Sequence, residues 1–206
     1  MVSKIQNQAI EDFWRWFSEA KSSFELLAET EDPLWDFALG KLKTIDEGLW
    51  FELSDLDVTP REFIITAEGI SELFPLVEEI VQKSPKDPNW KFVALKPPLG
   101  FDFVTEYEGI QVDPKDLWFL PLDSGTISSV LELRIGVRSY EPEKQEAVSS
   151  ATLLILDTAL GERIASQEIH VVEVCALPAS PEKEGYFALP ELPAYLAWRK
   201  RELFEL

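Results

Sequence analysis

The sequence predicts an α+β protein, with N-terminal helices followed by an antiparallel or mixed sheet that has helices packed on one face. Apolar residues recur at helical spacing near the N-terminus, and an alternation of apolar and polar residues begins near residue 49. Helical and strand patterns then take turns along the rest of the chain. This succession is typical of domains in which helices cover a sheet.

Two helices are predicted at the N-terminus. The first carries apolar residues at helical spacing on one face, namely Ile10, Phe13, Trp14, Phe17, Phe24 and Leu27. The second begins at Asp32-Pro33, because aspartate is a good N-cap and proline suits the first helical position. Gly48 is the expected end of this second helix.

A hairpin and a third helix are expected to follow. Residues 49–53 and 63–67 are predicted to pair as strands, because the residues between them favour turns. Ser71 is the expected N-cap of the third helix. Pro75 falls in the first turns of this helix, where a missing N–H costs least.

Strand patterns dominate the middle of the chain. Residues 90–96 and 101–107 are predicted as strands, and the second of these alternates mostly aromatic residues with mostly acidic ones. Asp113-Pro114 is expected to open a short turn or a helical turn before residues 117–122.

The second half of the chain shows a strand, a long helix, a further strand and a terminal helix. The first strand covers residues 130–137, and the long helix covers residues 142–160 and ends at Gly161. Residues 164–177 are predicted as one long strand or a bent pair of strands. The residues expected to dock the terminal helix are Leu192, Leu196 and Leu203.

Residues 60–96 and 130–177 thus form two strand–helix–strand units of similar length. A split β-α-β arrangement suits both units, although their sequences differ. We predict a single domain over residues 1–206, with a subdivision into 1–125 and 126–206 as the alternative.

Negative charge is spread over the whole chain. The formal net charge is −19, with 19 acidic and 10 basic residues in 1–100 and 19 acidic and 9 basic residues in 101–206. Nucleic acid and anionic membranes need basic contacts, so neither is an expected partner. A partner of this surface would be a basic protein or a cation, but an acidic surface that serves solubility alone is the favoured explanation of the composition.

The sequence lacks the common catalytic and cofactor-binding motifs. It holds no Walker A loop, dinucleotide fingerprint, HExxH or G-x-S-x-G motif, so no cofactor and no metal are predicted. His170 is the only histidine and Cys175 the only cysteine, and their odd separation along a predicted strand places them on opposite faces. A single cysteine, without a signal peptide or a membrane-spanning run, predicts a cytoplasmic location.

Carboxylates between residues 102 and 116 are the one abundant candidate group for chemistry. Asp102, Glu106 and Glu108 have even spacing, so a regular strand would place them on one face, and Asp113 follows closely. Neighbouring carboxylates of this kind hold Mg²⁺ or Ca²⁺, or divide the roles of acid and base. A half-buried strand with one solvated face explains the same alternation and is the favoured interpretation.

The same part of the chain is rich in aromatic residues. Residues 89–122 combine rings with the stiff Pro97-Pro98 and the permissive Gly100, an arrangement typical of binding loops on a rigid scaffold. Rings that fill the core are the favoured explanation. The candidate binding residues of the whole stretch are Trp90, Lys96, Phe101, Asp102, Phe103, Glu106, Glu108, Asp113 and Trp118.

Four motifs in this stretch resemble a set of small, uncharacterised bacterial proteins that share a domain of unknown function. The motifs are Trp90-Lys91-Phe92, Lys96-Pro97-Pro98, Gly100-Phe101-Asp102-Phe103 and Leu117-Trp118-Phe119-Leu120-Pro121-Leu122. The resemblance covers a small part of the chain. It implies a bacterial, intracellular origin and assigns no activity and no catalytic residue.

We therefore predict a non-catalytic, acidic binding protein that regulates or inhibits a basic protein partner. This prediction depends on the scarcity of histidine and cysteine, the lack of motifs and the uniform negative charge. A carboxylate-based enzyme or metal-binding protein that uses residues 102–116 is the alternative. A homo-oligomer joined by exposed aromatic rings is a third prediction.

Overall fold

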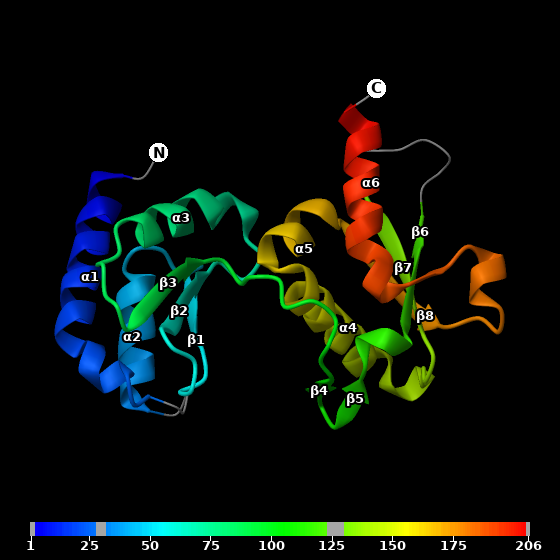
Figure 1. The fold of residues 1–206 in the computed structure, drawn as a ribbon, viewed down its shortest axis with the longest axis horizontal. Coiled ribbons are helices and arrows are strands. Elements are labelled where there is room, and N and C mark those ends of the chain that lie inside the picture. Colours follow the sequence, from blue (N-terminus) through cyan, green and yellow to red (C-terminus); the bar gives the residue numbers. More distant parts are fainter. Residues whose placement is uncertain (1–2, 28–31, 123–129, 205–206) are drawn as a thin grey trace. The chain divides into compact units, whose positions relative to one another are not determined.

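The part of the chain that the structure describes folds into six α-helices and nine strands in three sheets, which confirms the predicted α+β class. It divides into two compact units, residues 1–96 and residues 97–206, called the first and the second unit below (Figure 1). The alternative boundary predicted from the sequence falls inside the second unit. The computed structural model describes residues 3–27, 32–122 and 130–204. No helix within these ranges is long and apolar enough to cross a membrane.

The first unit packs three helices against a three-stranded sheet (Figure 1). Its elements are α1 (Lys4–Phe24), α2 (Pro33–Lys43), β1 (Trp50–Leu53), β2 (Arg61–Thr66), the 3₁₀ turn η1 (Ser71–Leu73), α3 (Phe74–Gln82) and β3 (Trp90–Ala94). Strands β1 and β2 form the predicted antiparallel hairpin. Helix α3 then connects β2 to the parallel strand β3.

Helix α2 begins where the sequence predicts and ends earlier. The side chain of Asp32 accepts a hydrogen bond from the N–H of Leu34, which confirms the predicted N-cap. The prediction that the helix ends at Gly48 is wrong, because the helix already ends at Lys43. Asp46 accepts the N–H of Gly48 at 3.0 Å, and this turn redirects the chain into β1.

Helix α3 also begins differently from the prediction. The prediction that Ser71 is its N-cap is wrong, because Ser71 opens η1 and no side chain caps either η1 or α3. Pro75 lies in the first turn of α3, as predicted. The proline costs little there, because the first N–H groups of a helix have no intrahelical partner.

Aromatic rings fill the core of the first unit. Phe63 in β2 is fully buried, stacks on Phe51 at 4.9 Å between ring centroids, and meets Phe17 edge to face at 5.3 Å. Ring pairs of this kind each add about 0.5–1.5 kcal/mol beyond the area that they bury. All residues of the predicted apolar face of the first helix are buried in this core, although Leu27 lies beyond the end of α1. The buried rings are Phe13, Trp14, Phe17, Phe24, Phe51, Phe63, Phe74 and Trp90.

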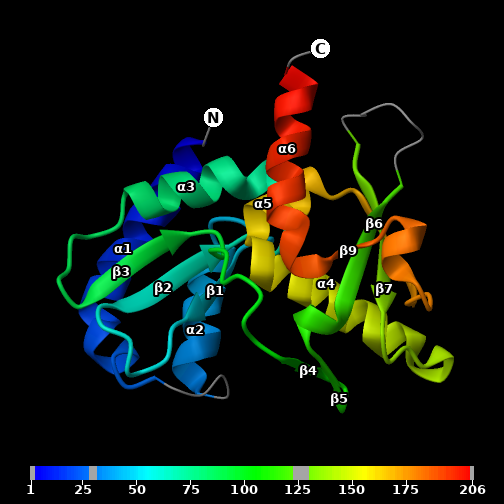
Figure 2. The same ribbon diagram turned by 45° about the vertical axis from the view of Figure 1, so that its right-hand side comes forward.

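The second unit packs helices against a four-stranded sheet and adds a two-stranded hairpin (Figure 2). The order of the main sheet is β8-β7-β6-β9, with β6 antiparallel to β7 and β7 parallel to β8. Its strands are β4 (Thr105–Tyr107), β5 (Ile110–Val112), β6 (Leu117–Pro121), β7 (Glu132–Val137), β8 (Val171–Ala176) and β9 (Phe187–Ala188). Its helices are α4 (Gln145–Leu160), α5 (Glu162–Glu168) and α6 (Leu192–Phe204), with 3₁₀ turns η2 (Pro114–Asp116), η3 (Pro142–Lys144), η4 (Pro181–Glu184) and η5 (Leu189–Glu191).

Aliphatic residues dominate the core of the second unit. Phe119 is the one ring among the buried described residues of this core. Leu192 and Leu196 dock α6 as predicted, whereas Leu203 is only half-buried. The aliphatic buried residues include Leu117, Leu133, Ile135, Val137, Val148, Ile155 and Leu160.

Both predicted strand–helix–strand units are present, over residues 61–94 and 132–176. In each of these two segments the parallel strands pair directly with one another. Neither segment is therefore a split β-α-β arrangement, in which another strand lies between the parallel pair.

The predicted strand over residues 101–107 is mostly wrong, because only Thr105–Tyr107 forms a strand. The N–H groups of Leu99 and Gly100 donate to carbonyl groups at the end of α4 and not to a neighbouring strand. The aromatic side chains that follow pack against the core from an irregular segment.

The predicted strand over residues 164–177 is wrong in its first half. Helix α5 occupies that part, and only Val171–Ala176 is a strand. Gly161 ends α4 as predicted, with a φ of 77° that glycine adopts at little cost. The chain bends there and starts a new helix.

Candidate functional site

Strands β4 and β5 form a tight hairpin that turns at Glu108-Gly109. Both turn residues have a positive φ, 47° for Glu108 and 76° for Gly109. The strand before the turn is only three residues long, so Glu108 lies in the turn and Asp102 precedes the strand. The expected shared face of Asp102, Glu106 and Glu108 therefore does not form.

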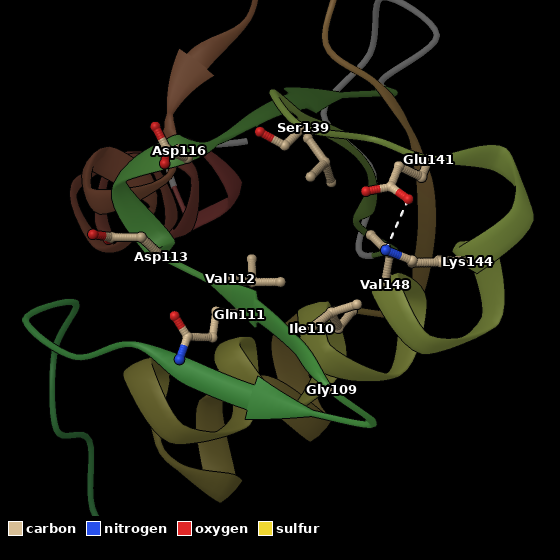
Figure 3. A pocket seen from close by; sticks show the side chains of 11 residues that line it. Gly109, Ile110, Gln111, Val112, Asp113, Asp116, Ser139, Glu141, Lys144 and Val148 are labelled. Carbon is tan, nitrogen blue, oxygen red and sulfur yellow. Dashed lines mark ion pairs between the residues drawn. The ribbon is translucent and has the colours of Figure 1, made fainter.

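The hairpin forms one side of a hollow of about 240 Å³, called the narrow hollow here (Figure 3). The other side comes from the end of β7, the connection to η3, and the first turns that lead into α4. Val112, Val137 and Val148 supply a buried apolar base. The lining residues are Gly109, Ile110, Gln111, Val112, Asp113, Asp116, Val137, Ser139, Glu141, Lys144 and Val148.

Carboxylates stand on opposite sides of the narrow hollow. Figure 3 shows Asp113 and Asp116 on one side and Glu141 with Lys144 on the other. Oε2 of Glu141 lies 2.8 Å from Nζ of Lys144, and Oδ1 of Asp116 lies 3.5 Å from Nε of Arg138. Both pairs are well exposed to solvent, and pairs of this kind contribute about 0–1 kcal/mol. A ligand can therefore compete for these carboxylates at low cost.

Asp113 is held in place by the backbone. Its Oδ1 accepts the N–H of Lys115 at 2.8 Å and caps η2, which confirms the predicted turn at Asp113-Pro114. The ammonium of Lys115 also lies 2.8 Å from Oδ1 of Asp102, and this hydrogen bond lowers the pKa of Asp102 below its ordinary value. Asp102 itself is exposed and is not among the residues that line either hollow.

A wider hollow of about 610 Å³, called the wide hollow, adjoins the narrow one. Ile110 and Lys144 line both hollows. Three exposed glutamates, Glu108, Glu143 and Glu146, line the wide hollow. Across the two hollows, the described lining residues thus carry six carboxylates and one cationic side chain.

Glu108 and Asp113 are the predicted binding residues that line these hollows. In the first unit, Trp90 belongs to the aromatic core, and Lys96 pairs with Glu52 and Glu68 at 3.7 and 3.3 Å. The structure therefore does not bring these two residues into the lining.

The other predicted binding residues of the second unit also lie outside the lining. Phe101 and Phe103 are half-buried against the core, so these rings serve packing. Glu106 is exposed in β4, opposite Gln111 of β5. Trp118 is half-buried in β6, opposite Gly136 of β7.

Sequence reasoning misses the polar residues that line the narrow hollow between β7 and α4. Ser139, Glu141 and Lys144 lie between β7 and α4, where the sequence indicates only the approach to a helix. The charged run over residues 141–146 is the available signal, because it directly precedes an apolar helix.

Histidine and cysteine take part in separate local contacts. Nδ1 of His170 accepts the N–H of Leu131 at 3.2 Å, and Sγ of Cys175 lies 3.8 Å from the hydroxyl oxygen of Tyr186. Burial raises the pKa of Tyr186 above its ordinary value. Within the described ranges, no group of three or more His, Cys, Asp or Glu residues is arranged to hold a metal ion.

Comparison with known proteins gives no match to a family model, to a curated protein or to a solved structure. The resemblance to uncharacterised bacterial proteins stays a prediction. The geometry and charge of the two hollows therefore carry the functional argument.

Proposed function

We propose that this chain is a non-catalytic binding protein whose two adjoining hollows take a basic segment of a partner protein. The charge of the hollows supports this most directly, because their described lining sets six carboxylates against one ammonium group. A positively charged segment is attracted by this field, whereas nucleic acid and anionic membranes are repelled.

The size of the narrow hollow favours a side chain over a whole small molecule. Sites for drug-sized ligands enclose about 300–1,000 Å³, and the narrow hollow encloses about 240 Å³. Its apolar base and charged rim match the aliphatic stem and cationic head of lysine or arginine. The wide hollow beside it has room for the neighbouring residues of a basic segment.

The carboxylates of the narrow hollow serve as fixed charges in this proposal. Asp113 caps a turn, and Asp116 and Glu141 each pair with a cation of the same chain. These contacts orient the side chains toward recognition of a cation. Electrostatic binding of a cation requires no catalytic step from these carboxylates.

Fluorescence anisotropy with a labelled octa-arginine peptide at physiological ionic strength tests the proposal. The double variant Asp116→Asn/Glu141→Gln is expected to weaken binding about tenfold or more, because each lost contact to a charged partner is worth about 1 kcal/mol near a surface. Circular dichroism checks that the variant keeps its fold.

The matched control removes two carboxylates from another place in the same unit. Glu182 and Glu184 are exposed, lie in η4 and do not line either hollow. The control variant Glu182→Gln/Glu184→Gln is expected to change binding only slightly. Equal weakening by both double variants would show that the overall charge, and not the hollows, binds the peptide.

A further inference from the structure

Lys144 occupies the boundary between the narrow and the wide hollow. It is the one cation among the described residues that line them, and it lines both. Its Nζ lies 2.8 Å from Oε2 of Glu141, and 48% of its side chain is exposed. The ammonium group can therefore leave Glu141 without loss of core packing.

The first unit has a leucine, Leu73, at the position equivalent to Lys144. In both units, four residues connect a six-residue strand to a three-residue 3₁₀ turn, and a helix follows. Leu73 is the last residue of that turn in the first unit, and Lys144 is the last in the second. Cδ1 of Leu73 lies 2.6 Å from the place where a Cβ on Gly48 would stand, so Leu73 fills its space. Lys144 leaves the hollow open and neutralises Glu141.

We propose that Lys144 is a built-in competitor that holds the cation position at Glu141 until an arginine or lysine of the partner replaces it. The inference rests on the proposed function and names the residue that sets the affinity of that site. One ion pair replaces another in the exchange, and the ammonium of Lys144 returns to solvent. A partner that lacks a cation at this point does not compensate Glu141, so the exchange selects for basic segments.

The variant Lys144→Met tests the inference with the same labelled octa-arginine peptide. Methionine keeps the length of the side chain and removes its charge, so binding is expected to tighten about three- to tenfold. Lys144→Arg keeps a competing cation and is expected to leave the affinity close to that of the wild type. Lys200→Met is the matched control, because Lys200 also lies near a glutamate, at 3.7 Å from Glu168, and lines neither hollow.

A double-mutant cycle separates competition from a general effect of charge. In the background of Glu141→Gln, the competitor has lost its target, so Lys144→Met is expected to tighten binding much less than in the wild type. The inference is wrong if Lys144→Met tightens binding no more than Lys200→Met, or equally in both backgrounds, and the proposed function then stands without it. If the wild-type protein does not bind the peptide at all, the proposed function itself fails.

Discussion

The two units of this protein share the order of elements from the hairpin to the 3₁₀ turn but differ in the side chains around the connection between them. In each unit, an antiparallel hairpin ends in a six-residue strand, followed by a four-residue connection and a 3₁₀ turn. One helix in the first unit and two in the second then lead to a parallel strand. In the first unit, the side chains of Ile70 and Leu73 lie against Gly48 beside this connection, with Leu73 half-buried and Ile70 43% exposed. The second unit has an open, charged hollow at the same connection.

Charged residues replace apolar ones at three equivalent positions. The first position directly precedes the first strand of the hairpin. The second directly precedes the 3₁₀ turn, and the third is the last residue of that turn. The apolar side chains of the first unit meet around Gly48, where Cδ1 of Ile70 and Cδ1 of Leu73 lie 3.1 and 2.6 Å from the point that a Cβ on this glycine would occupy. The pairs are Leu49 and Asp116, Ile70 and Glu141, and Leu73 and Lys144.

The comparison teaches that the fold does not require a hollow at this connection. At this connection, apolar side chains pack against Gly48 in the first unit, whereas charged side chains line a hollow in the second. Charged side chains at such a place bury less apolar surface than leucine or isoleucine would. Functional sites commonly carry a cost of this kind, so it fits the binding role that we propose for the second unit.

The largest expected effect concerns the aromatic core of the first unit. Phe63→Ala removes a fully buried ring at the centre of the aromatic core and is expected to lower the free energy of unfolding by about 3–5 kcal/mol. Tryptophan fluorescence during urea unfolding reports mainly on this unit, because five of the seven tryptophans lie in residues 1–96. Phe37→Ala is the control, since Phe37 is 53% exposed in the same unit and its loss is expected to cost far less. Similar losses for both variants would contradict the central role given to the aromatic core.

A smaller effect is expected where the sheet of the second unit is tightly covered. A Cβ on Gly136 would lie 2.7 Å from Cδ1 and 3.3 Å from Cα of Leu177, so the backbone itself must shift. Gly136→Ala is therefore expected to cost about 1–3 kcal/mol, measured by thermal unfolding. Gly40→Ala is the control, because Gly40 lies within α2 with no atom within 4 Å of the added Cβ, and it is expected to gain about 0.5–1 kcal/mol. A neutral Gly136→Ala variant would show that this side of the sheet is loosely covered.

The third experiment transfers the apolar residues of the first unit to the second. Glu141→Ile/Lys144→Leu is expected to seal the narrow hollow, abolish measurable binding of the octa-arginine peptide, and stabilise the protein by about 1 kcal/mol through added apolar burial. The reverse swap, Ile70→Glu/Leu73→Lys, is expected to destabilise the first unit, because it removes the apolar contacts around Gly48. Unchanged peptide affinity in the sealed variant would break the link between the open hollow and binding.

Strong periodicity explains which parts of the fold could be predicted from the sequence. The helical face of α1 and the ranges of both β-α-β units follow directly from the spacing of apolar residues. The same reasoning fails over residues 101–107. Alternating rings there pack against the core from an irregular segment, and an extended loop produces the same alternation as a strand.

The candidate site could be predicted only in part, because its two sides are distant in the sequence. Asp113 is a candidate from the sequence because it lies in a dense run of carboxylates. Glu141 and Lys144 join it only because β6 pairs with β7, which places Leu117 opposite Val137. A register of this kind depends on tertiary packing, and spacing along the chain does not reveal it.

The smallest expected effect on stability concerns an ion pair of the first unit that is less exposed than the pairs of the second unit. In the first unit, the ammonium of Lys21 donates to the largely buried carboxylate of Asp87, and this hydrogen bond lowers the pKa of Asp87 below its ordinary value. The pairs beside the hollows of the second unit are exposed instead. Asp87→Asn keeps an oxygen for the N–H of Asn89 and removes the charge, so it is expected to cost about 0.5–1 kcal/mol at pH 7.

The pH dependence of this loss follows from the sign of the shift. A carboxylate with a lowered pKa stabilises the folded state above its ordinary pKa, and this stability disappears as the pH falls through the folded-state value. The difference between wild type and Asp87→Asn in urea unfolding should therefore be full at pH 7 and shrink below about pH 4. Asp12→Asn removes the exposed pair with Arg15 in the same unit and is expected to cost less than Asp87→Asn at pH 7. A difference at Asp87 that is independent of pH would mean that shape, and not charge, accounts for its contribution, and the contrast with the exposed pairs of the second unit would then disappear.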